Sequence, residues 1–388
     1  MAVELNFSPK KKLLWVDQPE SVSSLVRGYY GEMKKGIIYL ELEEALYLID
    51  IRNGKCTDES LNEYKFNDVA EHFTEPKLMA RYHTYKDWRD RGLVLKPLPA
   101  KMEEDYGRSP VKKYPGKDFK PPKYAVQGMF FPEDLMTVID DEKVGRELYE
   151  DYWLGQFGTY KAEQRGRLNK LDAYETLFMM QHCGLGLRNS TTSKMKKEAK
   201  KRRPDFTSLY DVYEDWRQLG YVLKTGFKFG THFRLYFPGA SPTNEGKDWV
   251  HSKHVIQVFP RKTRLLISEW ARAIRVAHSV RKTFILAIPG KETKRSKVKL
   301  DFLLYHRKKG GIENPKEDKP HFLMWSLSEE EYIGGAELAD ALKQAKESGL
   351  DLILAIADRE TSVTYYRVKR IMLPGSKYEY YEIEWEQP

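Results

Sequence analysis

The chain is poor in cysteine and has no long apolar segment. Among its 388 residues only Cys56 and Cys183 are cysteines, which excludes a disulfide framework and a CxxC metal site. No run approaches the roughly 18 apolar residues that a membrane-spanning helix needs. The first residues, MAVELNFSPKKK, lack the apolar core of a signal peptide. We therefore expect a protein of the reducing cytoplasm, without a membrane segment.

What the chain does have is a large apolar content and an excess of positive charge. Hydrophobic residues make up 41% and aromatic residues 13%, enough for real cores and too much for a disordered protein. A chain of 388 residues predicts about two or three domains. The net charge of +9 suits an anionic partner such as a nucleic acid, although many basic proteins bind none.

Self-comparison reveals a first internal repeat. YHTYKDWRDRGLVLK (82–96) matches YDVYEDWRQLGYVLK (210–224) in register, with the same tyrosines, Asp-Trp-Arg triplet, glycine and final lysine. Upstream, 36–48 pairs with 166–179, and LVRGYYG (25–31) pairs more loosely with 148–155. Residues 1–96 and 130–224 are therefore predicted to be two copies of one unit.

A second duplication lies downstream. Residues 267–288 align without gaps to 335–356, and both segments predict an amphipathic helix that runs into a strand. The strands, FILAI and LILAI, are short apolar runs of the kind that is buried in the centre of a sheet. The apolar framework is thus present twice.

Two linkers divide these repeats into one complete and one split unit, because residues 97–122 are rich in proline and residues 289–297 are basic. The two split halves complement each other, so we expect them to fold together around the inserted complete unit. The predicted fold class is α/β (α+β), with duplicated units that each combine a small N-terminal mixed sheet/helix domain and a C-terminal mixed-sheet domain flanked by helices. The predicted divisions are 1–96 (degenerate N-terminal unit), 97–122 (linker), 123–288 (complete unit, with an N-terminal domain at 123–190 and a C-terminal domain at 204–288), 289–297 (linker) and 298–388 (degenerate C-terminal unit, pairing with 1–96).

Residues 224–284 carry a candidate catalytic set: Tyr236, His251 and Lys282. Metal-free cleavage of an RNA phosphodiester needs a base for the 2′-OH, an acid for the departing 5′ oxygen and a positive charge for the phosphorane. Tyr236 is the candidate base, His251 the acid and Lys282 the stabiliser, which would also favour ionisation of a neighbouring tyrosine.

Taken singly, each of these residues has an ordinary explanation, namely a core tyrosine, one of nine histidines and a lysine that complements a helix C-terminus. Comparison with the second copy favours catalytic roles over these ordinary explanations. In the second copy Lys282 aligns with Leu350 and His251 with Lys319, while the tyrosine has a counterpart in Tyr305, allowing one residue of slippage. A catalytic copy beside a degenerate structural copy accounts for this joint loss.

The blocks GFKFGTHFRLY, HSKHVIQVF and RVAHSVRK resemble the catalytic domain of archaeal tRNA-splicing endonucleases, and the YYG-containing segments resemble the N-terminal domain of that family twice. The resemblance implies the same three roles, 2′,3′-cyclic phosphate and 5′-OH products, and no metal or other cofactor. It also implies that Arg275 clamps a flipped bulge base. The segment before His251 is longer than is usual in the family, so His232 or His254 would become the acid if the register slipped.

The fused layout resembles the single-chain, three-unit branch of the family, which implies a homodimer that cuts precursor tRNA at a bulge-helix-bulge motif. Family members assemble through an acidic loop, and the matching loop here, ADRETS (357–362), carries Asp358 and Glu360. An ordinary charged hairpin turn is the alternative interpretation of this loop.

Two basic segments are further candidates for RNA contact. The complete unit carries QFGTYKAEQR (156–165) where the first copy has only EMKK, so Lys161 and Arg165 lie on an insertion that either reaches RNA or forms a longer solvated hairpin. The run KMKKEAKKRR (194–203) is predicted to be a solvated helix end, with RNA contact as the second possibility.

Two other functions compete with this interpretation. Asp205 followed by EGK (245–247) faintly resembles the carboxylate–lysine site of metal-dependent nucleases. The chain could also be a non-catalytic RNA-binding subunit, which suits residues 1–96 and 298–388 but not the intact Tyr–His–Lys unit.

Overall fold

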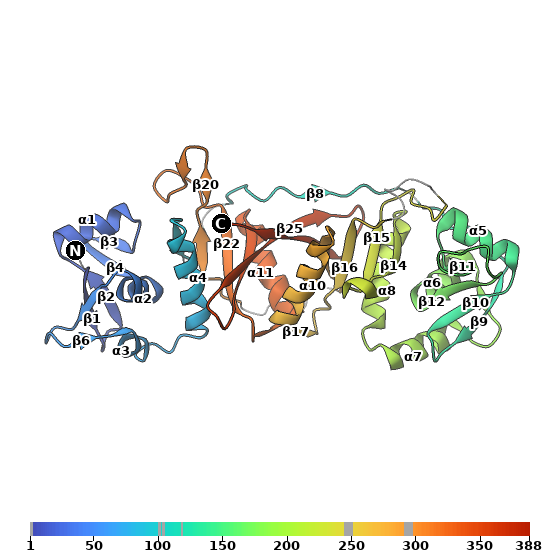
Figure 1. Ribbon diagram of the computed structural model, residues 1–388, viewed down its shortest axis with the longest axis horizontal. Helices are drawn as coiled ribbons and strands as arrows, with labels where there is room; N and C mark the ends of the chain where they lie inside the picture. The colour runs from blue at the N-terminus through green and yellow to red at the C-terminus, as the bar shows by residue number, and fades with distance from the viewer. Residues whose placement is uncertain (1–2, 100–101, 103–104, 118, 244–250, 291–297) are drawn as a thin grey trace.

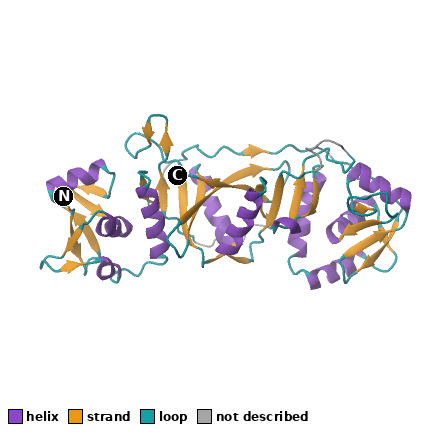
Figure 2. Cartoon of the chain, in the orientation of Figure 1, coloured by secondary structure: helices purple, strands orange, loops and turns teal. Residues whose placement is uncertain are grey.

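The protein is elongated, with a small domain at each end and one large sheet between them (Figure 1). This computed structural model describes residues 3–99, 102, 105–117, 119–243, 251–290 and 298–388. Helices and mixed sheets alternate along the chain, as the colouring by secondary structure shows (Figure 2), so the predicted α/β (α+β) class is confirmed. None of the helices in the described part of the chain is both long and apolar enough to cross a bilayer.

The first end domain is built on a six-stranded sheet in the order β3-β4-β2-β1-β5-β6. Its elements are β1 (Glu4–Ser8), β2 (Leu13–Val16), α1 (Pro19–Arg27), β3 (Glu32–Lys34), β4 (Ile37–Leu40), α2 (Leu42–Ile51), β5 (Lys55–Thr57), β6 (Glu63–Tyr64) and α3 (Phe66–Ala70). Alternate residues of β1 and β2 are buried, which is the period-two pattern of strands that cover a core with one face.

The other end domain repeats this plan with a five-stranded sheet in the order β11-β12-β10-β9-β13. Its elements are β9 (Gln127–Phe131), β10 (Met136–Ile139), α5 (Glu142–Tyr152), β11 (Gln156–Phe157), β12 (Asn169–Asp172), α6 (Ala173–Phe178), the π-helix η1 (Met179–Cys183), β13 (Gly186–Leu187) and α7 (Thr192–Arg202). Helix α7 buries Met195 and Ala199 and exposes most of its lysines, as the basic run predicts.

The central sheet has eleven strands, in the order β14-β15-β16-β18-β26-β25-β24-β22-β19-β7, with β8 paired to β25. The strands are β7 (Leu95–Pro97), β8 (Lys112–Lys113), β14 (Val222–Thr225), β15 (Phe233–Tyr236), β16 (His254–Val258), β18 (Thr283–Ile288), β19 (Phe302–Leu304), β22 (Phe322–Ser328), β24 (Asp351–Ala357), β25 (Val363–Met372) and β26 (Glu379–Glu386). The remaining elements are α4 (Leu78–Asp90), α8 (Phe206–Gln218), the 3₁₀ helix η2 (Phe227–Phe229), β17 (Arg264–Leu266), α10 (Ile267–Ser279), β20 (Arg307–Lys308), β21 (Gly311–Ile312), β23 (Tyr332–Gly334) and α11 (Gly335–Ser348).

Both sequence repeats have become structural repeats. Helices α4 and α8 each end shortly before a glycine in the left-handed region, Gly92 at φ 77° and Gly220 at φ 81°, and then turn into β7 and β14. Helices α10 and α11 run in the same way into the buried strands β18 and β24. Two copies of one sheet therefore lie side by side in the central sheet (Figure 1).

The last strand joins the two copies. Strand β26 pairs with β18 of the complete unit on one side and with β25 on the other. The hydroxyl of Tyr380 on β26 donates to Asp215 of α8 at 2.6 Å, just as Tyr365 on β25 donates to Asp87 of α4 at 2.7 Å. Asp87 and Asp215 are equivalent in the repeat, so β26 completes the sheet of residues 204–288 although it belongs in sequence to the segment 298–388.

Candidate active site

Tyr236 stands at the end of β15, with only 4% of its surface exposed. Its ring lies 4.6 Å from that of Trp153, which caps α5 in the left-handed conformation at φ 48°. The end domain of the complete unit thus supplies one wall around Tyr236. The other neighbour is Arg234, whose guanidinium lies 6.0 Å from the tyrosine ring centre.

Lys282 follows the C-terminus of α10 and precedes β18. Its backbone N–H donates to the Ala277 carbonyl at 2.9 Å, which continues the helical turn, and its side chain reaches Ser252, ahead of β16, and η2. The ammonium donates to the hydroxyl of Ser252 at 3.0 Å and to the Ser252 carbonyl, and it lies 4.7 Å from the ring centre of Phe229.

Ser252 connects the predicted catalytic residues. The serine is 5% exposed and hydrogen-bonds the Tyr236 side chain as well as Lys282. His251, an exposed residue, is its neighbour in the chain. Tyr236 and Lys282, from two separate sequence blocks, therefore meet at one buried hydroxyl group, and His251 precedes that serine in the chain.

The electrostatics of this cluster differ from the expectation in one respect. Burial raises the pKa of Tyr236, and it outweighs Arg234 and the hydrogen bond with Ser252, which both lower it. Burial, and then the charge of Arg234, lower the pKa of Lys282. The expectation that Lys282 makes Tyr236 acidic is therefore wrong for the unbound chain, in which the tyrosine keeps its proton at neutral pH.

The two competing histidines are partly buried. Burial lowers the pKa of both His232 and His254 to about 4, so neither carries an acidic proton at pH 7. Nδ1 of His232 accepts a hydrogen bond from the Val258 backbone N–H at 3.0 Å. His254 packs its ring 5.0 Å from Phe237. These surroundings favour His251 as the general acid.

The predicted RNA contacts lie around the cluster rather than inside it. Arg275 is exposed on α10, near enough to Tyr366 to act on the pKa of that hydroxyl. Lys161 and Arg165 are exposed on a tight turn that follows β11. Next to Lys161, the ring of Tyr160 makes a cation–π contact with Lys228, whose ammonium lies 5.2 Å from the ring centre. Lys228 belongs to η2, the turn that also contacts Lys282 through Phe229. The insertion therefore reaches the edge of the candidate site.

The degenerate copy is closed at the corresponding place. The backbone N–H of Tyr305 donates to the Val94 carbonyl, at the position where Tyr236 pairs with Val222, so Tyr305 is the structural counterpart of Tyr236. Leu350, in place of Lys282, is 1% exposed.

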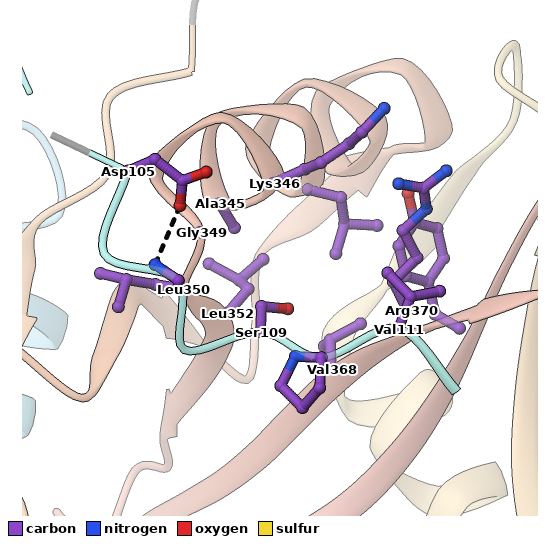
Figure 3. A pocket seen from close by; sticks show the side chains of 14 residues that line it. Asp105, Ser109, Val111, Ala345, Lys346, Gly349, Leu350, Leu352, Val368 and Arg370 are labelled. Atoms are coloured by element: carbon purple, nitrogen blue, oxygen red, sulfur yellow. Dashed lines mark hydrogen bonds between the residues drawn. The ribbon is translucent and has the colours of Figure 1, made fainter. Parts of the chain in front are cut away.

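Part of the proline-rich connector covers this degenerate site (Figure 3). Residues 105–111 cross the end of α11, where the Tyr106 and Arg108 backbone N–H groups donate to the carbonyls of Ser348 and Gly349. A small cavity of about 280 Å³ remains under this strap, between Ser109, Leu350 and Arg370. The place equivalent to the Tyr236–Lys282 cluster is thus covered by the chain itself in the degenerate copy.

The predicted acidic loop is the turn between β24 and β25. The Asp358 carboxylate accepts from the backbone N–H groups of Glu360 and Ser362, both at 2.9 Å, so this aspartate holds the turn together. Glu360 is exposed. Arg359 binds Glu330 at 2.5 Å, which adds the neighbouring acidic turn to the same surface.

The carboxylate of the rival metal site is already engaged. Asp205 accepts from the guanidinium of Arg203 at 3.1 and 3.2 Å and stands at the N-cap of α8. Residues 245–247, the other half of that motif, lie outside the described residues. Within the described ranges no group of three or more potential metal ligands occurs.

Sequence reasoning missed the residues that organise the cluster: Ser252, Trp153, Arg234 and Phe229. The sequence contained a signal for two of these residues, Trp153 and Phe229. Trp153 aligns with Tyr29 in the first repeat, and both residues take a positive φ, 48° and 59°. Phe229 belongs to the glycine-flanked GFKFG segment. The roles of Ser252 and Arg234 depend on strands brought together by the fold.

Fold and site together suit an enzyme built on a duplicated α/β scaffold. Comparison with known proteins agrees. Residues 206–299 match the family model of the tRNA intron endonuclease catalytic C-terminal domain, and residues 9–56 match that of its N-terminal domain. The chain belongs to the tRNA-splicing endonuclease family and is an RNA endonuclease.

Three similar proteins illustrate the relationship, each of them named tRNA-splicing endonuclease. That of Methanopyrus kandleri is 37% identical over 145 residues, which cover 36% of this chain and 75% of the relative. That of Methanococcoides burtonii is 27% identical over 330 residues, or 67% of this chain and 89% of the relative. That of Pyrobaculum islandicum is 30% identical over 170 residues, or 41% and 89%.

Proposed function

We propose that this protein cuts precursor tRNA at the intron–exon junctions of a bulge-helix-bulge motif, without a metal. The observation that carries the proposal is the meeting of Tyr236 and Lys282 at Ser252, directly beside His251. The copy of the same sheet that lacks the lysine and the histidine is closed by its own chain. Both cysteines are buried free thiols, which suits the predicted reducing cytoplasm.

The proposed reaction is an internal transesterification. Tyr236 accepts the proton of the 2′-OH, and the O2′ attacks the adjacent phosphorus. His251 donates a proton to the 5′ oxygen as the P–O5′ bond breaks. Lys282 stabilises the charge that develops on the phosphorane. The products are a 2′,3′-cyclic phosphate and a 5′-OH, so no water is consumed and no group is oxidised or reduced.

Because the raised pKa of Tyr236 keeps this residue protonated, the base step requires that its pKa falls when substrate binds. The substrate phosphate cannot cause this fall, since an anion beside the phenol raises the pKa further. Contact of Lys282 or Arg234 with the phenol oxygen would lower the pKa of Tyr236. Arg234 already lies near the tyrosine ring, and Lys282 shares Ser252 with it. The proposal therefore includes a shift of these cations toward Tyr236 in the complex.

End-group analysis of RNA cut in the presence of EDTA tests the function. We expect the purified chain to release 2′,3′-cyclic phosphate and 5′-OH ends from a bulge-helix-bulge precursor, at the same rate with and without EDTA. The control substrate is the same RNA with both bulges paired. Strict dependence on magnesium would favour the metal-dependent alternative, and failure of the chain to cut alone would favour a non-catalytic subunit.

Around this site, Lys161, Arg165 and Arg275 are proposed RNA contacts. All three are exposed cations, and the insertion that bears Lys161 reaches η2 through Tyr160 and Lys228. Arg275 is proposed to hold a bulge base by cation–π stacking. Neutral replacements should raise KM in the assay above and weaken its salt dependence, since fewer phosphates are neutralised.

We also propose that the working form is a homodimer. In it, residues 1–96 and 298–388 serve as the non-catalytic partner of the complete unit. The pairing of β7 with β19 and the bond between Thr84 and Ser326 at 2.7 Å support the joining of these two segments. The acidic surface of Asp358, Glu360, Glu329 and Glu330 is proposed to enter a basic cleft on the second chain.

Charge reversal at Glu360 tests this assembly. We expect Glu360→Lys to shift the mass in solution from two chains to one, with a rise in the dimer Kd of roughly 10²-fold or more, because like charges across an interface cost several kcal/mol. Glu360 is the better probe, since Asp358 also holds the turn. Glu59→Lys, an equal charge change at another exposed position, should leave the mass unchanged. A wild-type chain that sediments as a monomer would contradict the proposal.

A further inference from the structure

Phe227 is the most exposed large apolar residue among the described parts of the chain, with 86% of its surface in contact with solvent. It is the first residue of η2, at the tip of the turn between β14 and β15. Leaving a phenylalanine ring in water forgoes the stabilisation that its burial brings. The question is therefore what this ring contacts when the protein works.

The turn holds Phe227 in a defined place. The backbone N–H of Gly226 donates to the His232 carbonyl at 3.0 Å, and that of Phe229 donates to the Gly226 carbonyl at 2.8 Å. A Cβ atom at Gly226 would lie 2.5 Å from Oγ1 of Thr231, so only glycine fits there. Gly230 closes the turn at φ 64°. A ring presented by an ordered turn loses little conformational freedom on binding.

The same turn forms part of the rim of the candidate active site. Two residues after Phe227, the ring of Phe229 lies under the ammonium of Lys282 at 4.7 Å. Between them, Lys228 reaches Tyr160, itself 57% exposed. Exposed aromatic rings interleaved with lysines, beside a cluster suited to phosphodiester cleavage, are what a protein presents to unstacked bases.

Comparison of the two repeats separates this tip from the scaffold. After the equivalent lysines, the complete unit continues with TGFKFGTHF (225–233), whereas the degenerate unit continues with PLPA (97–100). The glycine-flanked aromatic tip is thus absent from the copy that also lacks the histidine and the lysine. A ring needed only for folding would have been kept with the buried Trp88 and Trp216, which both copies retain.

We propose that Phe227 is a stacking platform for an unpaired base of the RNA beside the cleaved phosphate. This inference rests on the proposed function, because it assigns one more contact to the same substrate. It differs from the clamp proposed for Arg275, since the ring offers an uncharged face that accepts any base. Phe227 is a positioning residue, which does not touch the reacting atoms.

Binding of a bulge-helix-bulge RNA to Phe227 variants tests the inference. In a His251→Ala background, which keeps the RNA intact, we expect Phe227→Ala to raise the Kd by about 5- to 150-fold, the range of one base–aromatic stack. Phe227→Trp should restore wild-type affinity. With 2-aminopurine in the bulge, its fluorescence should be quenched by the parent and by the tryptophan variant, and not by the alanine variant.

Leu61→Ala is the matched control, because Leu61 is 83% exposed on a turn of the first end domain and should leave the Kd unchanged. An unaltered Kd and unaltered quenching in Phe227→Ala would overturn the inference, while a wild-type chain that cuts the RNA would leave the proposed function standing. If Phe227→Ala instead lowers the mass in solution from two chains to one, the Phe227 ring contacts a second protein chain and not an RNA base.

Discussion

Replacement of His251 by alanine should lower the rate of RNA cleavage by about 10²- to 10⁴-fold, the usual contribution of one general acid–base residue. Without a proton donor, the 5′ oxygen has to leave as an alkoxide. His251 is the histidine suited to this role, since it is exposed at the edge of the Ser252 cluster. The measurement is the single-turnover cleavage rate at saturating enzyme, which separates chemistry from RNA binding.

A substrate with a better leaving group identifies the step. When sulfur replaces the 5′ oxygen at the cleaved bond, the departing thiolate needs no proton, so His251→Ala should recover most of its lost rate. Tyr236→Phe and Lys282→Ala should stay slow on that substrate, because the base and the stabiliser are still required. His254→Asn is the control and should cleave normal RNA within a few-fold of wild type. Loss of activity in His254→Asn with full activity in His251→Ala would invert the assignment.

The repeated elements were predictable because their residues are set by local packing. The tryptophans of the two Asp-Trp-Arg triplets, Trp88 and Trp216, are both completely buried, and each helix then turns at a glycine into a strand. Comparison of the copies also aligned Tyr305 with Tyr236. The structure confirms this alignment, because Tyr305 pairs with Val94 where Tyr236 pairs with the equivalent Val222. Such patterns depend only on neighbours within one helix–strand unit.

Long-range pairings were not predictable in the same way. Strand β26 mixes acidic residues with aromatic and β-branched ones, a composition that favours a strand and does not specify its neighbours. Its position beside β18 is fixed by contacts such as Tyr380 with Asp215, more than 160 residues away in sequence. The connector likewise joins the sheet through Lys112–Lys113, although its prolines indicate an extended chain without regular structure.

The residue types of the site were predicted from the sequence, but the direction in which the pKa of Tyr236 shifts was not. The sequence indicates a tyrosine, a histidine and a lysine close together, and the structure joins two of them through Ser252. The direction of the Tyr236 pKa depends on burial, which a linear sequence does not reveal. Burial by Trp153 comes from another domain, and it outweighs the nearby cation.

Replacement of Lys224 by methionine should destabilise the contact between the end domain and the sheet of the complete unit by about 3–5 kcal/mol. Lys224 is 12% exposed and binds Glu175 at 2.6 Å, while both residues hold Gly155 through its carbonyl and its N–H. Methionine fills the space but leaves the Glu175 carboxylate buried without its cation. A protein with several domains does not unfold in one step, so the effect should be measured by native-state hydrogen exchange at β12 and β14.

The repeat supplies the control. Lys96 and Glu44 hold Gly31 at 2.7 and 3.0 Å in the same way. The two charges still act on each other's pKa, but they do not form a close salt bridge like that of Lys224 with Glu175, so Lys96→Met should cost less. The double variant Lys224→Met/Glu175→Gln should regain most of the lost protection, because no charge is then left unpaired.

Gly155 lies two residues after Trp153, whose ring covers Tyr236. Lys224→Met should therefore also slow cleavage while Lys96→Met does not, and equal effects of the two on cleavage would contradict a role for the end domain in placing the catalytic tyrosine.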